Sequence, residues 1–152
     1  MEYGEYIALY PDGPEEGAFE RLSWQARRIM ERATTGVDGV CKLRVAPPED
    51  EHGAEAVRRC EAALIRALWQ GEQTESYVNR EDGTVTARLV TGLTAGAESV
   101  TFAAPTAAGP GSGEREVRLG RTVSEYLSGI NDANGVNLLY MGRYPVEVEG
   151  DV

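Results

Sequence analysis

The sequence predicts a mainly α-helical protein, a small bundle of three main helices and a short N-terminal helix, with an inserted β-hairpin and an extended C-terminal arm. Three observations predict this fold class. Three stretches repeat apolar residues at spacings of three and four, helix-starting and helix-stopping residues flank these stretches, and one stretch alternates around β-branched residues. A chain of 152 residues fits a single domain.

The N-terminal part, residues 1–80, is predicted to be helical. Residues 3–10 are rich in aromatic side chains and predict the short helix. The first long helix is predicted over residues 14–34, since Pro14 suits an early helical position and Gly36 suits the end. Cations near its C-terminus suit the helix dipole, namely Arg27, Arg28 and Arg32. Its inner face is predicted to carry Phe19, Leu22, Ala26, Ile29, Met30 and Ala33.

The second long helix is predicted over residues 52–77, after a connection over residues 36–51 that Pro47 and Pro48 interrupt. Glu55 and Arg59 stand four residues apart, in the favourable order for an ion pair on a helix. His52 is expected to be a surface or capping residue. The buried stripe is predicted to consist of Val57, Cys60, Leu64 and Leu68. Trp24 and Trp69 are expected to be core or interface anchors.

Residues 81–113 predict a β-hairpin and a flexible loop. The turn signal Asp82-Gly83 precedes the alternating residues 84–90, and residues 100–102 repeat the alternation. The last helix is predicted over residues 114–129, with Gly129 as its stop and an inner face of Leu119, Val123, Tyr126 and Leu127. Residues 130–152 lack a helical pattern and are predicted to form the C-terminal arm. We expect no internal repeat.

The charge balance limits the partners that we expect. The formal net charge is −10, and the basic residues are fourteen arginines and one lysine, Lys42. Binding to duplex DNA needs a basic face, so an outer surface that grips DNA is not expected. The N-terminal stretch has neither the basic nor the apolar region of a signal peptide, and no stretch reaches the length of a membrane helix. We expect a soluble protein made in a cytoplasm.

Residues that could carry chemistry are sparse. Cys41, Cys60 and His52 leave a four-ligand zinc site one ligand short, and a disulfide is disfavoured in a reducing compartment. Cys60 is expected to act as a small buried hydrophobic residue. Motifs of serine hydrolases, phosphate-binding loops and zinc proteases are missing from the sequence. Acidic pairs at helix starts suit the dipole. We therefore expect neither an enzyme nor a cofactor or metal.

Several segments follow one another in an order known from one family of proteins. They are YGEY at residues 3–6, FERL at 19–22, CEAAL at 60–64 and ESVTF at 98–102. The clearest part is YLSG at residues 126–129 followed by NLLYMG at 137–142. Over nearly its whole length the chain resembles the head–tail connector, or head-completion adaptor, family of long-tailed phages. It departs from the family in the insertion of residues 130–136 and in Met141, where a basic residue is common.

The resemblance implies a structural protein of the virion neck, made in the bacterial host. Its copies would form a closed ring of about twelve subunits beneath the portal, built from head-to-tail contacts. The ring would extend the DNA channel and receive the next protein, a head-closure or tail-terminator protein. Genomic DNA would pass through without sequence-specific binding, which an acidic or neutral wall favours.

The resemblance also points to residues that would contact partners. In the family the C-terminal segment docks onto the portal, which predicts portal contacts through Leu138, Leu139, Tyr140, Met141 and Tyr144. A chain truncated after Gly135 is then expected to keep its helices and lose portal binding. Subunit contacts are predicted through Arg118 and Arg121 and, at the hairpin edge, through Val85, Leu89, Val100 and Phe102.

Three alternatives stay open. The apolar patch of the arm could fold back on the bundle instead of reaching a partner. The chain could be a small cytoplasmic helical domain with a binding or regulatory role and no portal contact. It could also be a hydrolase that uses carboxylates and a metal, which would need acidic residues clustered on one concave face.

Overall fold

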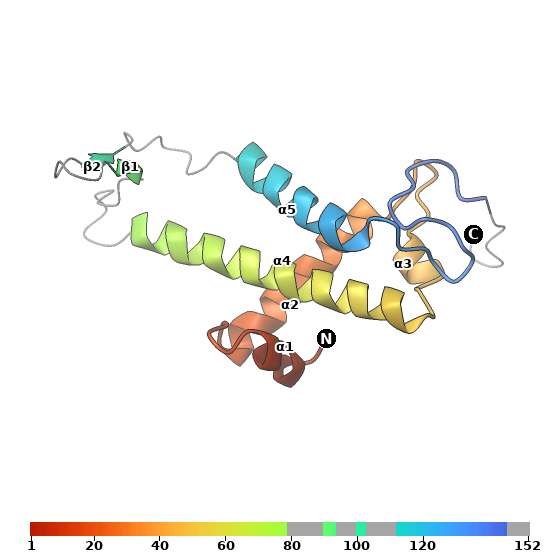
Figure 1. Cartoon of the computed structure of the whole chain (residues 1–152), viewed down its shortest axis with the longest axis horizontal. Helices are drawn as coiled ribbons and strands as arrows, with labels where there is room; N and C mark the ends of the chain where they lie inside the picture. Colours follow the sequence, from red (N-terminus) through yellow and green to blue (C-terminus); the bar gives the residue numbers. More distant parts are fainter. Residues whose placement is uncertain (79–89, 94–99, 103–111, 146–152) are drawn as a thin grey trace. The chain divides into compact units, whose positions relative to one another are not determined.

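A computed structural model describes residues 1–78, 90–93, 100–102 and 112–145 of the chain. In these ranges the protein is mainly helical, as the sequence predicts (Figure 1). The helices are α1 (Tyr3–Leu9), α2 (Glu16–Ala33), α3 (Lys42–Val45), α4 (Glu51–Val78) and α5 (Ser112–Leu127). Two strands are described, β1 (Val90–Leu93) and β2 (Val100–Phe102).

The chain divides into two compact units. The first comprises Met1–Trp69 and Val117–Val152, and the second comprises Gln70–Glu116. The first unit holds α1, α2, α3, the first part of α4 and most of α5. All predicted contact residues outside the hairpin fall in this first unit.

Local hydrogen bonds set the helix starts. The backbone N–H of Glu2 donates to the Glu5 carboxylate at 3.0 Å and completes a capping box for α1. Before α4, the Asp50 carboxylate accepts the backbone N–H of Gly53 at 2.7 Å. Helix α2 begins two residues later than predicted, because Glu15 is extended and serves as the cap.

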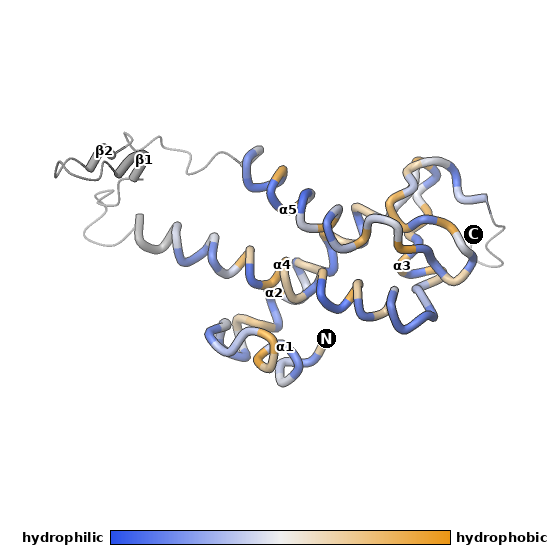
Figure 2. Tube along the Cα trace, in the orientation of Figure 1, coloured by the Kyte–Doolittle hydropathy of each residue, from blue (hydrophilic) through white to orange (hydrophobic). Residues whose placement is uncertain are grey.

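The core of the first unit lies where α1, α2, α4 and α5 pack together. Figure 2 shows hydrophobic residues recurring among hydrophilic ones along α2 and α4, as an amphipathic helix requires. The three predicted inner faces are confirmed: most of their residues are buried, and the others are partly buried and pack against the core. The innermost side chains include Tyr6, Leu22, Leu64, Ile65, Val123, Leu127 and Leu138. Of the two tryptophans, Trp69 packs against this core, whereas Trp24 is exposed.

Helix α3 lies in the stretch predicted to be a connection. Its first residue, Lys42, is only 1% exposed. The Lys42 ammonium and the Lys42 backbone N–H both donate to the carbonyl oxygen of Thr34, at 2.9 and 3.2 Å. Thr34 is the C-terminal cap of α2. The lysine therefore places its charge at the negative end of the α2 dipole, where a cation is stabilising.

Two loops have the same hydrogen-bond pattern, although the sequence predicted no internal repeat. The first loop, residues 34–42, follows α2, and the second loop, residues 130–138, follows α5. The backbone pairs across the first loop from Gly36 N to Val40 O and across the second from Asp132 N to Val136 O. Each turns on a glycine with positive φ, at Gly39 and Gly135. The two loops share little sequence beyond Gly-Val after an Asp or Asn, which explains why the pattern was missed.

The closing hydrogen bonds of the two loops also match. Lys42 N donates to Thr34 O in the first loop, and Leu138 N donates to Ile130 O in the second. Both closing residues, Lys42 and Leu138, point inward and are fully buried. Each loop thus returns the chain to the core directly after the turn.

The second unit contains the two described strands. β1 and β2 pair antiparallel, with Val90 opposite Phe102 and Leu93 opposite Val100. A bulge lies between Val90 and Gly92. Apart from Val90, the predicted strand over residues 84–90 lies outside the described residues. Among the helices that the structure describes, none is both long and apolar enough to cross a membrane.

Candidate interaction surface

The two loops contact each other through their backbones. The N–H of Val37, at the tip of the first loop, donates to the carbonyl of Met141 at 2.9 Å. The N–H of Ala133, at the equivalent position of the second loop, donates to the carbonyl of Ala46 at 3.2 Å. Each loop tip therefore bonds to the chain that leaves the other loop, and α3 lies beside both (Figure 1).

Tyr144 joins the two loops with its backbone and its side chain. Its N–H donates to the Asp38 carboxylate of the first loop at 2.7 Å. Its hydroxyl donates to the Asp132 carboxylate of the second loop at 2.6 Å and accepts from the Asn134 amide at 3.0 Å. Asp132 also accepts the backbone N–H of Val136. These hydrogen bonds hold residues 130–145 to the rest of the first unit at several points.

This geometry differs from the predicted extended arm. Leu138 is 0% exposed and belongs to the hydrophobic core, and Tyr144 is 8% exposed. Leu139 is half-buried against the same core. Burial of Leu138 in the fold contributes roughly 2 kcal/mol of transfer free energy, which an arm reaching into solvent would forfeit. A portal contact through Leu138 or Tyr144 would require these side chains to leave the fold.

Tyr140 and Met141, also predicted to contact the portal, lie on the surface. Tyr140 is 48% exposed and Met141 is 52% exposed. Val37, which bonds to Met141 through its backbone, is 81% exposed. We call Val37, Tyr140 and Met141 the loop patch. The sequence did not predict a contact role for Val37, although an isolated valine in the glycine-rich stretch at residues 36–39 was a visible indication of one.

Two glycines let the loop patch form. A Cβ at Gly142 would overlap the Tyr140 ring, and a Cβ at Gly36 would approach the carbonyl oxygen of Gly142 to 2.5 Å. The close approach of the two segments therefore depends on the missing side chains. The Tyr140 ring rests directly on the backbone of Gly142.

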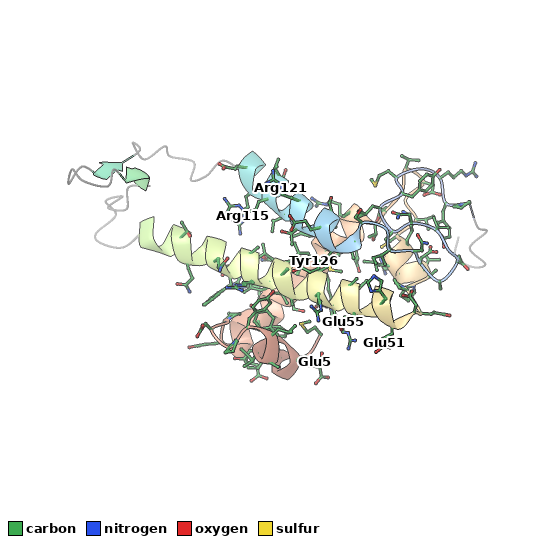
Figure 3. All side chains as sticks on the ribbon, viewed as in Figure 1. Glu5, Glu51, Glu55, Arg115, Arg121 and Tyr126 are labelled. Atoms are coloured by element: carbon green, nitrogen blue, oxygen red, sulfur yellow. The ribbon has the colours of Figure 1, made fainter. Side chains whose placement is uncertain are left out.

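The predicted subunit contacts lie in different parts of the chain. Arg118 and Arg121 are exposed on α5, where Figure 3 labels Arg121. Val100 and Phe102 belong to β2, while Val85 and Leu89 lie outside the described residues. Arg118 and Arg121 belong to the first unit, whereas the described hairpin belongs to the second.

A basic pocket beside the first loop was not predicted. Arg28 and Arg32 from α2 and Arg44 from α3 line a surface pocket of about 310 Å³, which the structure leaves open to solvent. Glu31 and Cys41 also line it. The spacing of four residues between Arg28 and Arg32 indicated that they share one face of the helix. The position of Arg44 depends on α3, which the sequence did not predict. Three arginines thus line one pocket on a chain of net charge −10.

A second pocket lies between α1 and α4. It measures about 260 Å³ and includes Glu5 and Glu55, which Figure 3 labels. Glu55 accepts from Arg59 at 2.8 Å and pairs with Arg58 at 2.9 Å, so the predicted ion pair is confirmed. The Arg59 hydrogen bond lowers the pKa of the Glu55 carboxyl. The pair is exposed, so screening by solvent leaves it little effect on stability.

Buried polar groups of the core are mostly satisfied. The Glu61 carboxylate accepts from the Ser23 hydroxyl at 2.8 Å and from Arg27 at 3.0 Å, which ties α4 to α2. Cys60 is fully buried as expected, and burial raises the pKa of its thiol to about 12. Both cysteines are free. The hydroxyl of Tyr6 is buried without a hydrogen-bond partner in the described part of the chain.

The described residues contain no group of three or more His, Cys, Asp or Glu side chains that could hold a metal ion. Comparisons of the chain with protein-family models, with curated proteins and with solved structures found no match.

Proposed function

We propose that the chain is a structural subunit of a phage neck, a head–tail connector that binds the portal through the loop patch. The observation that carries the proposal is the position of Tyr140 and Met141. Both lie in residues 137–142, the segment that most resembles the connector family, and both are exposed. Apolar side chains held at a surface are typical of protein contact sites.

The way the loop patch is held supports a contact made by a pre-organised surface. Val37 and Met141 are joined by a backbone hydrogen bond, and the Tyr140 ring rests on Gly142. A surface ordered before binding loses less conformational entropy when it docks. Tyrosine and methionine are also enriched at interface cores. The predicted mode of binding therefore changes from an arm that orders on contact to a fixed patch.

Portal binding is tested by mixing the full chain with the portal protein of the same virus and viewing the particles by electron microscopy. The unsubstituted chain is expected to add density beneath the portal ring. The variant Tyr140→Ser/Met141→Ser is expected to weaken binding at least about tenfold, because hot-spot side chains contribute about 2 kcal/mol each. Val117→Ser is the matched control, because Val117 is an exposed apolar residue on α5.

The proposal fails if the unsubstituted chain adds no density to the portal. In that case a small helical binding domain becomes the better description. If the control weakens binding as much as the patch variant does, the contact lies elsewhere on the first unit.

Ring formation is tested separately on assembled particles. Subunit contacts through the exposed Arg118 and Arg121 are part of the proposal. The variant Arg118→Glu/Arg121→Glu is expected to reduce the fraction of closed rings, since each change reverses a charge at the contact. If rings form unchanged with this variant, the two arginines do not lie at the subunit interface.

A further inference from the structure

The basic pocket lies where the end of α2 meets α3. Arg28 and Arg32 come from the second half of α2, and Arg44 comes from α3. The meeting of the two helices is fixed by Lys42, whose buried ammonium and backbone N–H both bond to the Thr34 carbonyl at the C-terminal cap of α2. The fold thus brings three arginines to one pocket before a ligand arrives, which lowers the ordering cost of binding.

The charge of the basic pocket is not balanced by the described part of the chain. There, Arg28, Arg32 and Arg44 make no ion pair, and Arg28 lies over the Trp24 ring at 5.3 Å, a contact that leaves its charge in place. Among the described residues that line the pocket, Glu31 is the only acid. Guanidinium groups stay charged at all physiological pH values, so three arginines and one ionised glutamate leave the pocket a formal charge of +2.

The net charge of −10 does not prevent an anion from binding here. At physiological ionic strength the Debye length is about 8 Å, so charges that lie farther than this from the pocket are largely screened. The charge of the pocket itself therefore decides which ligands it favours.

A phosphate group matches the pocket in charge and in hydrogen-bonding groups. A phosphate monoester carries a charge of about −1.5 to −2 at pH 7 and presents three strong acceptor oxygens. Each guanidinium offers a rigid fork of N–H donors that suits phosphate oxygens. A single carboxylate has one charge and two oxygens, and would leave part of the pocket's charge unbalanced. The volume of about 310 Å³ lies at the lower end of the range for small-molecule sites, roughly 300–1,000 Å³.

We propose that the basic pocket binds the phosphate group of a small molecule, either inorganic phosphate or a phosphate monoester, through Arg28, Arg32 and Arg44. Because the pocket is open to solvent, the dissociation constant for inorganic phosphate is expected to be on the order of 1 mM. The inference is independent of the phage-neck proposal, since it involves neither the loop patch nor the portal.

Cys41 provides a reporter inside the pocket. It lines the pocket and is partly exposed, whereas Cys60 is fully buried and serves as the internal control. The experiment measures the rate at which N-ethylmaleimide, an uncharged reagent, labels each thiol of the full chain, and peptide mass spectrometry separates the two sites. About 10 mM sodium phosphate is expected to slow labelling of Cys41 roughly tenfold relative to sodium chloride of equal ionic strength, because the pocket would be about 90% filled. Labelling of Cys60 should not change.

Four further probes identify the ligand chemistry. Adenosine monophosphate should protect Cys41, whereas adenosine and sodium acetate should not, since neither presents a phosphate group. Protection by adenosine monophosphate that exceeds protection by inorganic phosphate identifies the ester as the better ligand, and otherwise the free ion is. A DNA duplex at the same concentration of phosphate groups should protect less than inorganic phosphate, because a duplex also meets the acidic surface around the pocket.

Charge variants test the role of the three arginines. Arg28→Gln/Arg32→Gln/Arg44→Gln is expected to reduce the protection by phosphate to less than about twofold, since the charge-assisted hydrogen bonds are lost. The matched control is a second triple variant, which removes the same charge from exposed arginines of α4 outside the pocket and should keep the tenfold protection. It is Arg58→Gln/Arg59→Gln/Arg66→Gln.

A change in the Cys60 rate would show that a variant has altered the fold. In that case the test uses Arg44→Gln alone, which leaves α2 unchanged and is expected to lose at least half of the protection.

The remaining outcomes overturn the proposal. Equal Cys41 rates in phosphate and chloride mean that the pocket does not bind phosphate. Protection by acetate as strong as by phosphate means that the pocket takes carboxylates, and stronger protection by the duplex means that it takes a nucleic-acid backbone. Protection that survives both the triple substitution and Arg44→Gln means that phosphate shields Cys41 without using the arginines.

Discussion

Tyr6 and Tyr144 are both buried, but their hydroxyl groups have different surroundings. The Tyr6 ring packs against the rings of Tyr10 and Phe19, and the Tyr6 hydroxyl is buried with no hydrogen-bond partner in the described ranges. The Tyr144 hydroxyl bonds to Asp132 and Asn134. Burial raises the pKa of both hydroxyls. A buried donor without a partner costs stability, whereas a satisfied one contributes to it.

Removing the two hydroxyl groups is therefore expected to have opposite effects. Tyr6→Phe should raise the free energy of unfolding by about 1 kcal/mol, because the unpaired hydroxyl is no longer buried. Tyr144→Phe should lower it by about 1–2 kcal/mol, because the buried Asp132 carboxylate loses a donor. Urea denaturation of both variants measures the two changes. Shifts of the same sign would show that the described hydrogen bonds do not govern the stability of these sites.

Asp38 gives the fold a dependence on acid pH. The Tyr144 N–H, the main cause, holds the pKa of the Asp38 carboxyl below its ordinary value of 3.8. A lowered pKa in the folded chain means that this stabilisation is complete above pH 3.8 and is lost as the pH falls through the lower folded value. Asp38→Asn removes the titrating group.

The unsubstituted chain should accordingly lose more stability on acidification below pH 3.8 than Asp38→Asn does. Denaturation curves at a series of pH values measure this difference. Parallel stability profiles for the two chains would mean that the Tyr144 contact to Asp38 does not persist in solution.

Helices and loops differ in how far the sequence predicted them. The faces of α2, α4 and α5 follow from apolar spacing, because burial of one stripe is a local property of a helix. Helix α3 and the two loops do not, because they depend on contacts between distant residues. The hydrogen bond from Val37 to Met141 joins segments that no local pattern relates.

The matched loops make a prediction about glycine. Gly39 and Gly135 have φ values of 79° and 78°, and a Cβ at either position would meet nothing within 4 Å. Replacement by alanine should therefore cost only the left-handed backbone strain, about 1–2 kcal/mol at each site. Gly120→Ala, inside α5 and equally unobstructed, should instead raise stability by roughly 0.5–1 kcal/mol.

Thermal unfolding of the three alanine variants compares these effects directly. Similar losses at Gly39 and Gly135 are expected if the loops have equivalent backbones. A stabilised Gly39→Ala or Gly135→Ala chain would contradict the positive φ angle at that position.

At the scale of the whole molecule, the mainly helical class was predicted and the role of the C-terminal segment was not. Residues 130–145 lack a helical period, which favoured an arm that leaves the bundle. A non-helical segment can still bury side chains when its own backbone hydrogen bonds are satisfied. The backbone hydrogen bonds of the second loop and the contacts of Tyr144 meet this condition, and Leu138 is buried in the core. The exposed Tyr140 and Met141 remain candidates for a partner contact.

Truncation at two positions is expected to show which C-terminal residues belong to the core. A chain ending at Gly135 loses Leu138 and Tyr144 and should be destabilised by at least about 4 kcal/mol, since removal of one buried leucine alone costs 2–5 kcal/mol. A chain ending at Pro145 keeps both residues and should unfold at nearly the same urea concentration as the full chain. Far-ultraviolet circular dichroism during urea denaturation measures both. If the chain ending at Gly135 is stable and unfolds cooperatively, the residues after Gly135 form a removable arm and are not part of the core.

The single lysine has a consequence for chemical labelling. Lys42 is the only lysine in the sequence, and its ammonium is buried against the Thr34 carbonyl. Acylating reagents, and enzymes that modify lysine, therefore find no exposed side-chain amine on the folded chain. Copies of this chain cannot be linked to one another through lysine pairs, however close they lie. Reagents that couple carboxylates or the partly exposed thiol of Cys41 are the ones that can report its neighbours.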